Sequence, residues 1–306
     1  MKNLFFLVFI FTSTVSASSI PPLSLDLSHT TVSGISSGGY MAGQFHIAHS
    51  DWVKGVGIIA AGPYYCAENS LSTALSRCIN KQETIPLQGL LNHIKLLSKN
   101  SEIADITHLE NAKVWIFHGT KDDKVNQQVT DTLAQQYQAL MKNSQVNYVN
   151  DQPFAHHFPT ENFGAACDQS VAPYLGNCEY NAAANMLSFI LPNLKPAVAV
   201  STGEVIAINQ QELGGESGSE LADTGYLYIP KQCKEGEKCQ LHISFHGCNQ
   251  YAEAEDIGTR YVENTGINQF ADSNNFIVFY PQTKKSLYMP MNPQGCWDWW
   301  GYTGEN

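Results

Sequence analysis

The stretch that most constrains the fold is Gly34-Ile35-Ser36-Ser37-Gly38, which matches the pattern G-x-S-x-G. In this pattern a serine stands at the tip of a sharp turn between a strand and a helix, and small flanking residues let the helix fold back close to the strand. The β-branched run Thr30-Thr31-Val32 precedes the motif, and Gly39 to Ala48 follows it as a helix with small residues in its first turn. The sequence therefore predicts a strand–turn–helix unit that exposes the Ser36 hydroxyl beside the N–H groups of a helix N-terminus.

Further apolar runs of strand length alternate with segments of helical pattern. The predicted strands suit burial on both faces of a parallel sheet. They are Val53–Ala61, Ala112–Phe117, Gln145–Val149 and Asn275–Tyr280, and the predicted helices include Val129–Met141 and Asn181–Ile190. Strands that alternate with helices indicate the α/β class, with a mostly parallel sheet flanked by helices.

A serine nucleophile needs a base, and the base needs an acid that orients it; in α/β-hydrolases the chain order is serine, acid, histidine. Asp122 and Asp123 directly follow a predicted strand and are the acid candidates. The pattern H-G-x-x-D-x-x-V favours Asp122, whereas Asp123 fits a solvated loop carboxylate. The base candidates, His156 and His157, are adjacent, so at most one of the two rings can face Ser36.

Stabilising the oxyanion of acyl transfer takes two backbone N–H groups, and the residue after the nucleophile, Ser37, supplies one. The second usually comes from a strand-His-Gly loop that precedes the serine, but only 35 residues precede Ser36. A loop of this kind stands late in the chain, at Phe245-His246-Gly247-Cys248. The strands that normally come first then lie at the end, so the sequence predicts a circularly permuted α/β-hydrolase fold.

The N-terminus predicts export. Lys2 precedes the apolar run Leu4 to Phe11, which is too short to span a bilayer, and Val15-Ser16-Ala17 offers small residues for cleavage. We expect a signal peptide at residues 1–17, one catalytic domain over residues 18–306, and no membrane anchor. The net charge of −11 argues against nucleic acid or an anionic membrane as a partner.

The eight cysteines form an even set, which fits an oxidising compartment, and no C-x-x-C spacing indicates a zinc site. Eight cysteines allow roughly 100 connectivities. Nearness in sequence favours Cys66–Cys78, Cys167–Cys178 and Cys233–Cys239, and leaves Cys248 with Cys296. Tyr226–Pro230 and Leu241–Phe245 are predicted to form paired strands around the Cys233–Cys239 tip. We expect no metal or cofactor.

Four segments together resemble the secreted polyhydroxybutyrate depolymerases, above all their single-domain, circularly permuted type. They are Ser33–Ala42, His156–Thr160, Phe245–Gln250 and Asn292–Tyr302. The resemblance covers nearly the whole mature chain. It implies a Ser–His–Asp esterase that cuts poly(3-hydroxybutyrate) or 3-hydroxyalkanoate oligomers through an acyl-enzyme, so the expected partner is a polyester or oligoester.

The resemblance also assigns roles. Ser36 is the nucleophile, Asp122 the orienting acid and His156 the base, because the family's histidine stands three residues before a proline, here Pro159. Ser37 and Cys248 would donate the oxyanion N–H groups. Two departures concern Ala155, where the family usually has glycine, and the end of the chain soon after Tyr302, where members continue into another helix. The second departure indicates a truncated chain or a different closure of the fold.

Three tryptophans, Trp297, Trp299 and Trp300, are candidates for the wall of an apolar crevice that binds methyl-bearing ester units. The competing interpretation is that they are core residues, as most tryptophans are. If the segment is extended, alternation places Trp297 and Trp299 on one face and Trp300 on the other.

Two other functions fit the same residues. A feruloyl, acetyl-xylan or small-ester esterase would use the same serine, acid and histidine, and a secreted binding protein would keep the fold without the activity. The complete set Ser36, Asp122 and His156 favours the enzyme. The oligomeric state has no signal in the sequence.

Overall fold

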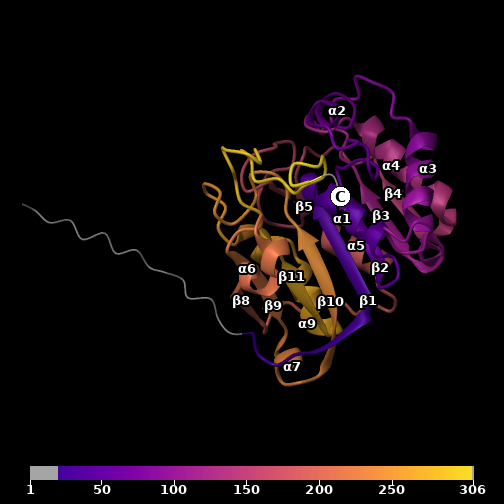
Figure 1. Ribbon diagram of the computed structural model, residues 1–306. Helices are drawn as coiled ribbons and strands as arrows, with labels where there is room; N and C mark the ends of the chain where they lie inside the picture. Colours follow the sequence, from indigo (N-terminus) through magenta and orange to yellow (C-terminus); the bar gives the residue numbers. More distant parts are fainter. Residues whose placement is uncertain (1–19, 305–306) are drawn as a thin grey trace, which may run out of the picture.

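A computed structural model describes residues 20–304, so the predicted signal peptide at residues 1–17 lies outside the described residues. Its centre is an eight-stranded sheet with the order β4-β3-β2-β1-β10-β11-β9-β8. The strands are β1 (Ser24–Ile35), β2 (Val53–Ile59), β3 (Lys113–Phe117), β4 (Val146–Val149), β8 (Glu204–Asn209), β9 (Thr224–Ile229), β10 (Lys238–Phe245) and β11 (Phe276–Tyr280). In Figure 1 the indigo β1 lies beside the orange β10, although the two are far apart in sequence.

The strand directions confirm the permuted α/β-hydrolase arrangement. All neighbours from β4 to β11 are parallel, and only β9 and β8 are antiparallel additions at one edge. The first strand of the chain, β1, occupies the middle of the sheet between β2 and β10. The carboxyl ends of the six parallel strands therefore meet at one edge of the sheet.

One predicted pairing is wrong. Tyr226–Pro230 and Leu241–Phe245 do not pair, because β11 lies between β9 and β10 and pairs with both. The connection contains a short helix, α7 (Lys231–Lys234), rather than a tight turn. The apolar β11 is buried along most of its length and so takes an internal place in the sheet, which separates the two strands that nearness in sequence would join.

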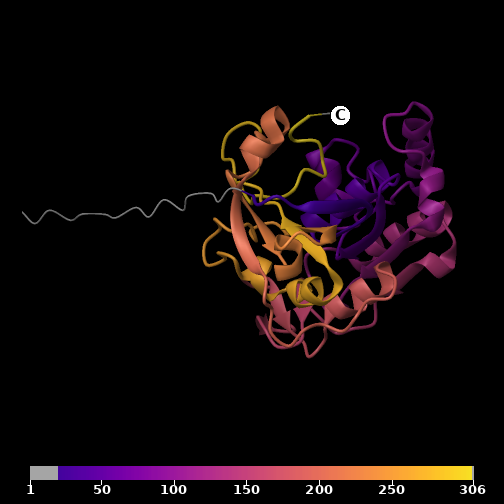
Figure 2. The ribbon, with the colours of Figure 1, turned by 90° about the horizontal axis from the view of Figure 1, so that it is seen from below.

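Helices cover both faces of the sheet. In β3, the side chains of Val114 and Ile116 point to one face of the sheet. This face is covered by α1 (Ser37–Ala48), α3 (Leu87–Lys99) and α4 (Gln127–Leu140). The side chains of Trp115 and Phe117 point to the opposite face, which is covered by α5 (Ala182–Ile190), α8 (Arg260–Asn264) and α9 (Ile267–Asn274) (Figure 2). Alternate residues of a strand point to opposite faces, so each strand contributes to two apolar layers.

A second, three-stranded sheet follows β4 and was not predicted from the sequence. Its order is β5 (Phe158–Thr160), β7 (Leu175–Asn177) and β6 (Ala165–Ala166). The remaining short elements are α2 (Leu71–Ser76), η1 (Ile106–Asn111), η2 (Asn143–Gln145), α6 (Gln210–Gly214) and η3 (Gly215–Gly218). Among residues 20–304, no helix has the length and apolar character needed to cross a membrane.

All four predicted disulfides are confirmed. They are Cys66–Cys78, Cys167–Cys178, Cys233–Cys239 and Cys248–Cys296. The second closes the loop that contains the small sheet, and the fourth joins the loop after β10 to the tryptophan segment.

Candidate active site

The predicted turn at Ser36 is confirmed. Ser36 has φ 56° and ψ −125°, between β1 and α1, and its N–H donates to the Ile59 carbonyl at 2.9 Å. The glycines on either side are required by close backbone contacts: a Cβ on Gly34 would lie 2.1 Å from the Gly38 oxygen, and one on Gly38 would lie 2.3 Å from the Phe245 oxygen. Ser36 is half-buried whereas its neighbours on both sides are buried, so the turn presents this serine.

His156 and Asp122 form a hydrogen-bonded pair. The His156 Nδ1 lies 2.7 Å from Asp122 Oδ2, and the Asp122 side chain is only 1 % exposed. Its other oxygen accepts the backbone N–H groups of Lys124 and Val125 at 2.8 and 2.9 Å. Asp123 instead is exposed and approaches the Lys124 ammonium at 3.2 Å. The structure thus separates the two acid candidates by burial and by partner.

His157 faces away from this pair. Its Nε2 lies 2.8 Å from the carbonyl of Cys167, and a Cβ on Gly176 would lie 2.1 Å from the ring. The His157 ring therefore packs against β7 of the three-stranded sheet. It lies near Cys167 and Cys178 in a group with metal-ligand spacing, but both sulfurs are in a disulfide and supply no thiolate.

Electrostatics keep Asp122 charged. Burial alone raises the pKa of Asp122, but the charge and hydrogen bond of His156, the nearby His118 and the Val125 N–H outweigh it, so the pKa lies below its usual value. His118 Nε2 lies 3.9 Å from Asp122 Oδ2, and burial lowers the pKa of His118. The Asp122 charge also acts on Tyr40: burial and then this charge raise the pKa of Tyr40. The acid therefore lies near α1, the helix that begins beside Ser36.

The sheet brings the candidate residues to one edge. Ser36 follows β1, the Asp122 loop follows β3, the His156 loop follows β4, and the His246–Cys248 loop follows β10. These strands are parallel, so all four loops emerge at the same edge. Two glycines let neighbouring loops touch. A Cβ on Gly119 would lie 2.2 Å from the Phe154 oxygen, and one on Gly247 would lie 3.4 Å from Ser36 Cβ.

The candidate oxyanion donors lie on either side of the turn. Ser37 is the first residue of α1, where a backbone N–H has no partner within the helix. Cys248 directly follows Gly247 and is bonded to Cys296. The Ser37 hydroxyl accepts the backbone N–H of Trp297 at 3.3 Å. The tryptophan segment is therefore attached to both candidate donors.

The three tryptophans have different surroundings. Trp297 is buried edge-on against Phe245, with ring centroids 5.0 Å apart, as a core residue. Trp299 is also buried and stacks on Tyr40 at 4.1 Å, where it lines a cavity of about 800 Å³ along α1. Trp300 is only half-buried and packs at 4.9 Å against Tyr302. Trp297 and Trp299 are thus more deeply buried than Trp300.

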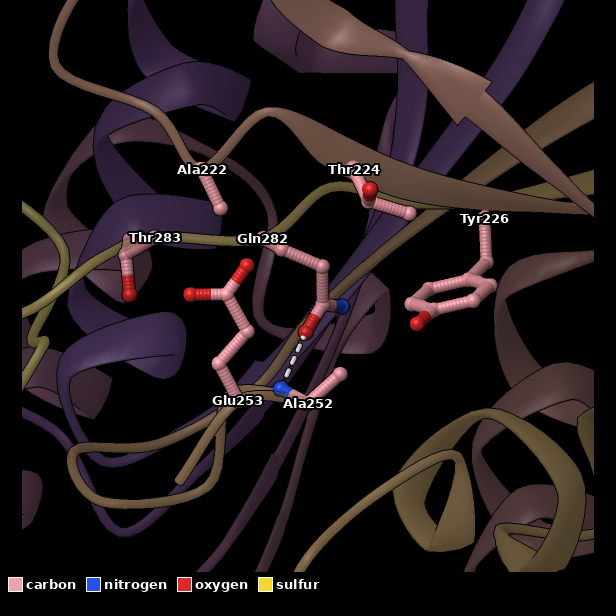
Figure 3. A pocket seen from close by; sticks show the side chains of 7 residues that line it. All are labelled: Ala222, Thr224, Tyr226, Ala252, Glu253, Gln282 and Thr283. Carbon is pink, nitrogen blue, oxygen red and sulfur yellow. Dashed lines mark hydrogen bonds between the residues drawn. The ribbon is translucent and has the colours of Figure 1, made fainter. Parts of the chain in front are cut away.

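A smaller cavity, of about 300 Å³, lies among β9, the segment after Tyr251 and the segment after β11 (Figure 3). The Ala252 N–H donates to Gln282 Oε1 at 2.8 Å across it. None of Ser36, Asp122 and His156 lines this cavity. Its wall residues are Ala222, Thr224, Tyr226, Ala252, Glu253, Gln282 and Thr283.

Sequence reasoning assigned no role to several residues that hold the loops in place. Gln250 Oε1 accepts the Gly247 N–H at 2.7 Å, and its Nε2 donates to the carbonyls of Pro173 and Tyr174 at 3.0 and 3.1 Å. The Ser170 hydroxyl donates to the His156 carbonyl at 2.7 Å. Gln250 stands in a motif that the sequence analysis singled out, which is a usable signal, whereas Ser170 has no local signal.

The permuted sheet and the serine at its central strand define the class of protein: a circularly permuted α/β-hydrolase. No family model matches the chain. It is 37% identical over 296 residues to "Poly(3-hydroxybutyrate) depolymerase" of Delftia acidovorans, covering 95% of this chain and 58% of that protein. It is 35% identical over 306 residues to "Polyhydroxybutyrate depolymerase" of Talaromyces funiculosus, covering 95% of this chain and 88% of that protein.

The solved structures agree. The crystal structure of PHB depolymerase from Penicillium funiculosum superposes with a TM-score of 0.86 and 33% identity, over 94% of this chain and 92% of that one. A second structure with the same TM-score of 0.86 is a PHB depolymerase with a serine replaced by alanine, complexed with an R3HB trimer. The chain belongs to the polyhydroxybutyrate depolymerase family, whose members are ester hydrolases. It spans 58% of the length of the Delftia relative.

Proposed function

We propose that this chain is a secreted serine esterase that hydrolyses poly(3-hydroxybutyrate) or its oligomers, with one catalytic domain over residues 18–306. The hydrogen-bonded His156–Asp122 pair at the edge of the sheet where Ser36 stands is the observation that carries the proposal. The family membership supports the ester class, and the related complex with an R3HB trimer supports the polyester. The signal-like N-terminus and four disulfides support secretion.

The hydrogen bond at Asp122 sets the proton on His156. A carboxylate only accepts, so His156 Nδ1 carries the proton at 2.7 Å and Nε2 keeps its lone pair. Nε2 takes the proton of the Ser36 hydroxyl while Oγ attacks the ester carbonyl, and then gives it to the leaving alcohol. In the second step Nε2 takes a proton from the water that attacks the acyl-enzyme, and gives it to the Ser36 oxygen as the acid product leaves.

The N–H groups of Ser37 and Cys248 stabilise the oxyanion that forms in both steps. Each such donor contributes on the order of 3 kcal/mol to the transition state in enzymes of this kind. A turn in which a helix N-terminus and a neighbouring loop supply these groups needs no side-chain acid at the carbonyl.

Product analysis tests the proposal. The wild-type chain should clear a poly(3-hydroxybutyrate) suspension and release 3-hydroxybutyrate and short oligomers. Ser36→Ala should lose at least about 10⁴-fold in kcat on a soluble oligomer, because the nucleophile is gone. An organophosphonate should label Ser36 in the wild type and nothing in the variant.

Two results would contradict this function. Turnover of feruloyl or acetyl-xylan esters without release of hydroxybutyrate would indicate another esterase. Neither turnover nor phosphonate labelling, in a protein that binds polymer, would indicate a binding protein.

A further inference from the structure

The peptide group between Gly247 and Cys248 has a fixed orientation. Among residues 20–304 the only cis peptides are Ala172–Pro173 and Met289–Pro290, so this peptide is trans and its C=O and N–H point in opposite directions. Two donors hold its carbonyl: His246 Nδ1 at 2.7 Å and the Gln250 N–H at 3.3 Å. A carbonyl has two lone pairs, so both are occupied, and the Cys248 N–H points the other way.

The partners of His246 fix its proton. The Gly247 carbonyl can only accept, so His246 Nδ1 donates to it. The Thr283 backbone N–H can only donate, and it approaches Nε2 at 3.2 Å, so Nε2 accepts. The imidazole is therefore neutral with its proton on Nδ1.

The surroundings of His246 keep it in that form. The side chain is fully buried, and its neighbouring rings are Tyr251, Tyr261 and Trp297, at centroid distances between 5.3 and 6.4 Å. Burial lowers the pKa of His246 to about 4. Unlike His156, this ring has no carboxylate partner among its hydrogen bonds.

We propose that His246 is a positioning residue for the hydrolysis: its Nδ1–H holds the Gly247 carbonyl so that the Cys248 N–H faces the carbonyl being attacked at Ser36. The proposal rests on the proposed function, in which Cys248 donates to the oxyanion. The place of the peptide supports it, because Gly247 lies directly against Ser36.

Two further contacts brace the same loop. Thr283 forms part of the wall of the 300 Å³ cavity in Figure 3, and its hydroxyl donates to the Gly295 carbonyl, next to the Cys248–Cys296 disulfide. Gln250 joins the loop to the carbonyls of Pro173 and Tyr174. Thr283 thus holds the Nε2 side of the His246 ring, and the Nδ1–H on the other side of the ring donates to the Gly247 carbonyl.

A matched pair of variants separates positioning from packing. In His246→Asn the side-chain amide nitrogen stands one bond from Cγ, as Nδ1 does, and can still donate to the Gly247 carbonyl. In His246→Gln the amide stands one bond further out, where its oxygen can still accept from Thr283 but no donor lies beside Gly247. The two variants have similar polarity, and His246→Gln is the closer to histidine in size.

With a soluble 3-hydroxybutyrate trimer, His246→Gln should lose roughly 10²- to 10³-fold in kcat, the loss typical of one missing oxyanion donor. KM should change less than about threefold, because the ground-state carbonyl gains little from that donor. His246→Asn should lose no more than about tenfold. The acidic limb of the kcat/KM profile should stay at its wild-type pH in both, and thermal unfolding should show that both are folded.

Equal kcat losses in the two folded variants, or a loss confined to KM, would refute the role of His246 while wild-type hydrolysis and its loss in Ser36→Ala uphold the proposed function. Absence of hydrolysis by the wild type would refute both.

Discussion

The two halves of the sheet contribute to the site in different ways. In the proposed mechanism, the half built from β1 to β4 supplies the Ser37 N–H and three side-chain groups: the Ser36 hydroxyl, the Asp122 carboxylate and the His156 ring. In the same mechanism, the half built from β8 to β11 supplies only a backbone N–H, at Cys248, in a loop held by a buried histidine, a glutamine and a disulfide. Proton transfer depends on the chemical identity of side chains, whereas oxyanion stabilisation depends on how a backbone N–H is oriented toward the substrate carbonyl. Each half can therefore be tested by the kind of change to which it should be sensitive.

The largest effect should come from the acid of the first half. Asp122→Asn should lower kcat about 10⁴-fold, because an amide can donate to His156 Nδ1 and so favours the wrong tautomer. Asp123→Asn should remain near wild type, since that carboxylate is exposed and faces Lys124. Steady-state rates on a soluble oligomer check this. Equal losses in the two variants would contradict the division between buried and solvated acid.

Both halves should respond to acid, because each buries neutral histidines. Burial lowers the pKa of His46, in the first half, to about 3, and those of His242 and His246 to about 3 and 4. The unfolded chain binds these protons near the ordinary value of 6.5, so stability rises with pH and falls below pH 6.5. At pH 5 each histidine should cost about 2 kcal/mol, roughly 30-fold in the unfolding equilibrium.

Urea unfolding at several pH values measures that slope. His242→Gln is the control, because it removes one of these three histidines while its amide can still bond to Thr31 or Ser33. Its stability should depend on pH less steeply than that of the wild type. Stability that is unchanged between pH 6.5 and 5 would show that the unfolded state gains no protons there.

Removing the disulfide of the second half should cost activity through geometry. Cys248→Ala with Cys296→Ala frees the loop that holds the oxyanion peptide, so kcat should fall roughly tenfold even where the protein stays folded. Cys233→Ala with Cys239→Ala, in a loop of sequence separation 6 remote from the site, should change stability alone. Rates measured beside thermal unfolding distinguish the two. A tenfold loss in the control pair would contradict the link between this disulfide and the site.

The smallest effect should concern solid polymer only. The loop before the tryptophan segment exposes Tyr288 and Met289, which are 85% and 86% accessible, and Asn292 in the same loop holds the Cys296 N–H at 2.9 Å. Tyr288→Ser with Met289→Ser should slow clearing of a polymer suspension a few-fold. The variant has less apolar side-chain surface to bury against the polymer, so it should adsorb more weakly. Rates on the soluble trimer should not change. A matching loss on the trimer would show that the loop acts on the site instead.

The comparison also explains which parts were predictable. Ser36 and Asp122 stand in the short patterns G-x-S-x-G and H-G-x-x-D-x-x-V. Each pattern lies within a single loop after a strand, so the local backbone sets its spacing and the sequence alone reveals it. The buried strands β2, β3 and β11 are apolar runs whose neighbours in the sheet do not affect their assignment. The small sheet after His156 was missed because its strands are only two or three residues long, and a disulfide closes the loop that contains them.

The sequence by itself predicted the turn at Ser36, the permuted order of the strands and three of the cysteine pairs, because each follows from residues close together or from their order along the chain; the fourth pair, Cys248–Cys296, was the one left over. Tertiary structure alone decided that His157 meets the Cys167 carbonyl, that β11 separates β9 from β10, and that His246 holds the Gly247 carbonyl. Those choices depend on which distant segments pack together, and packing is settled by burial and by hydrogen-bond partners that no short pattern contains.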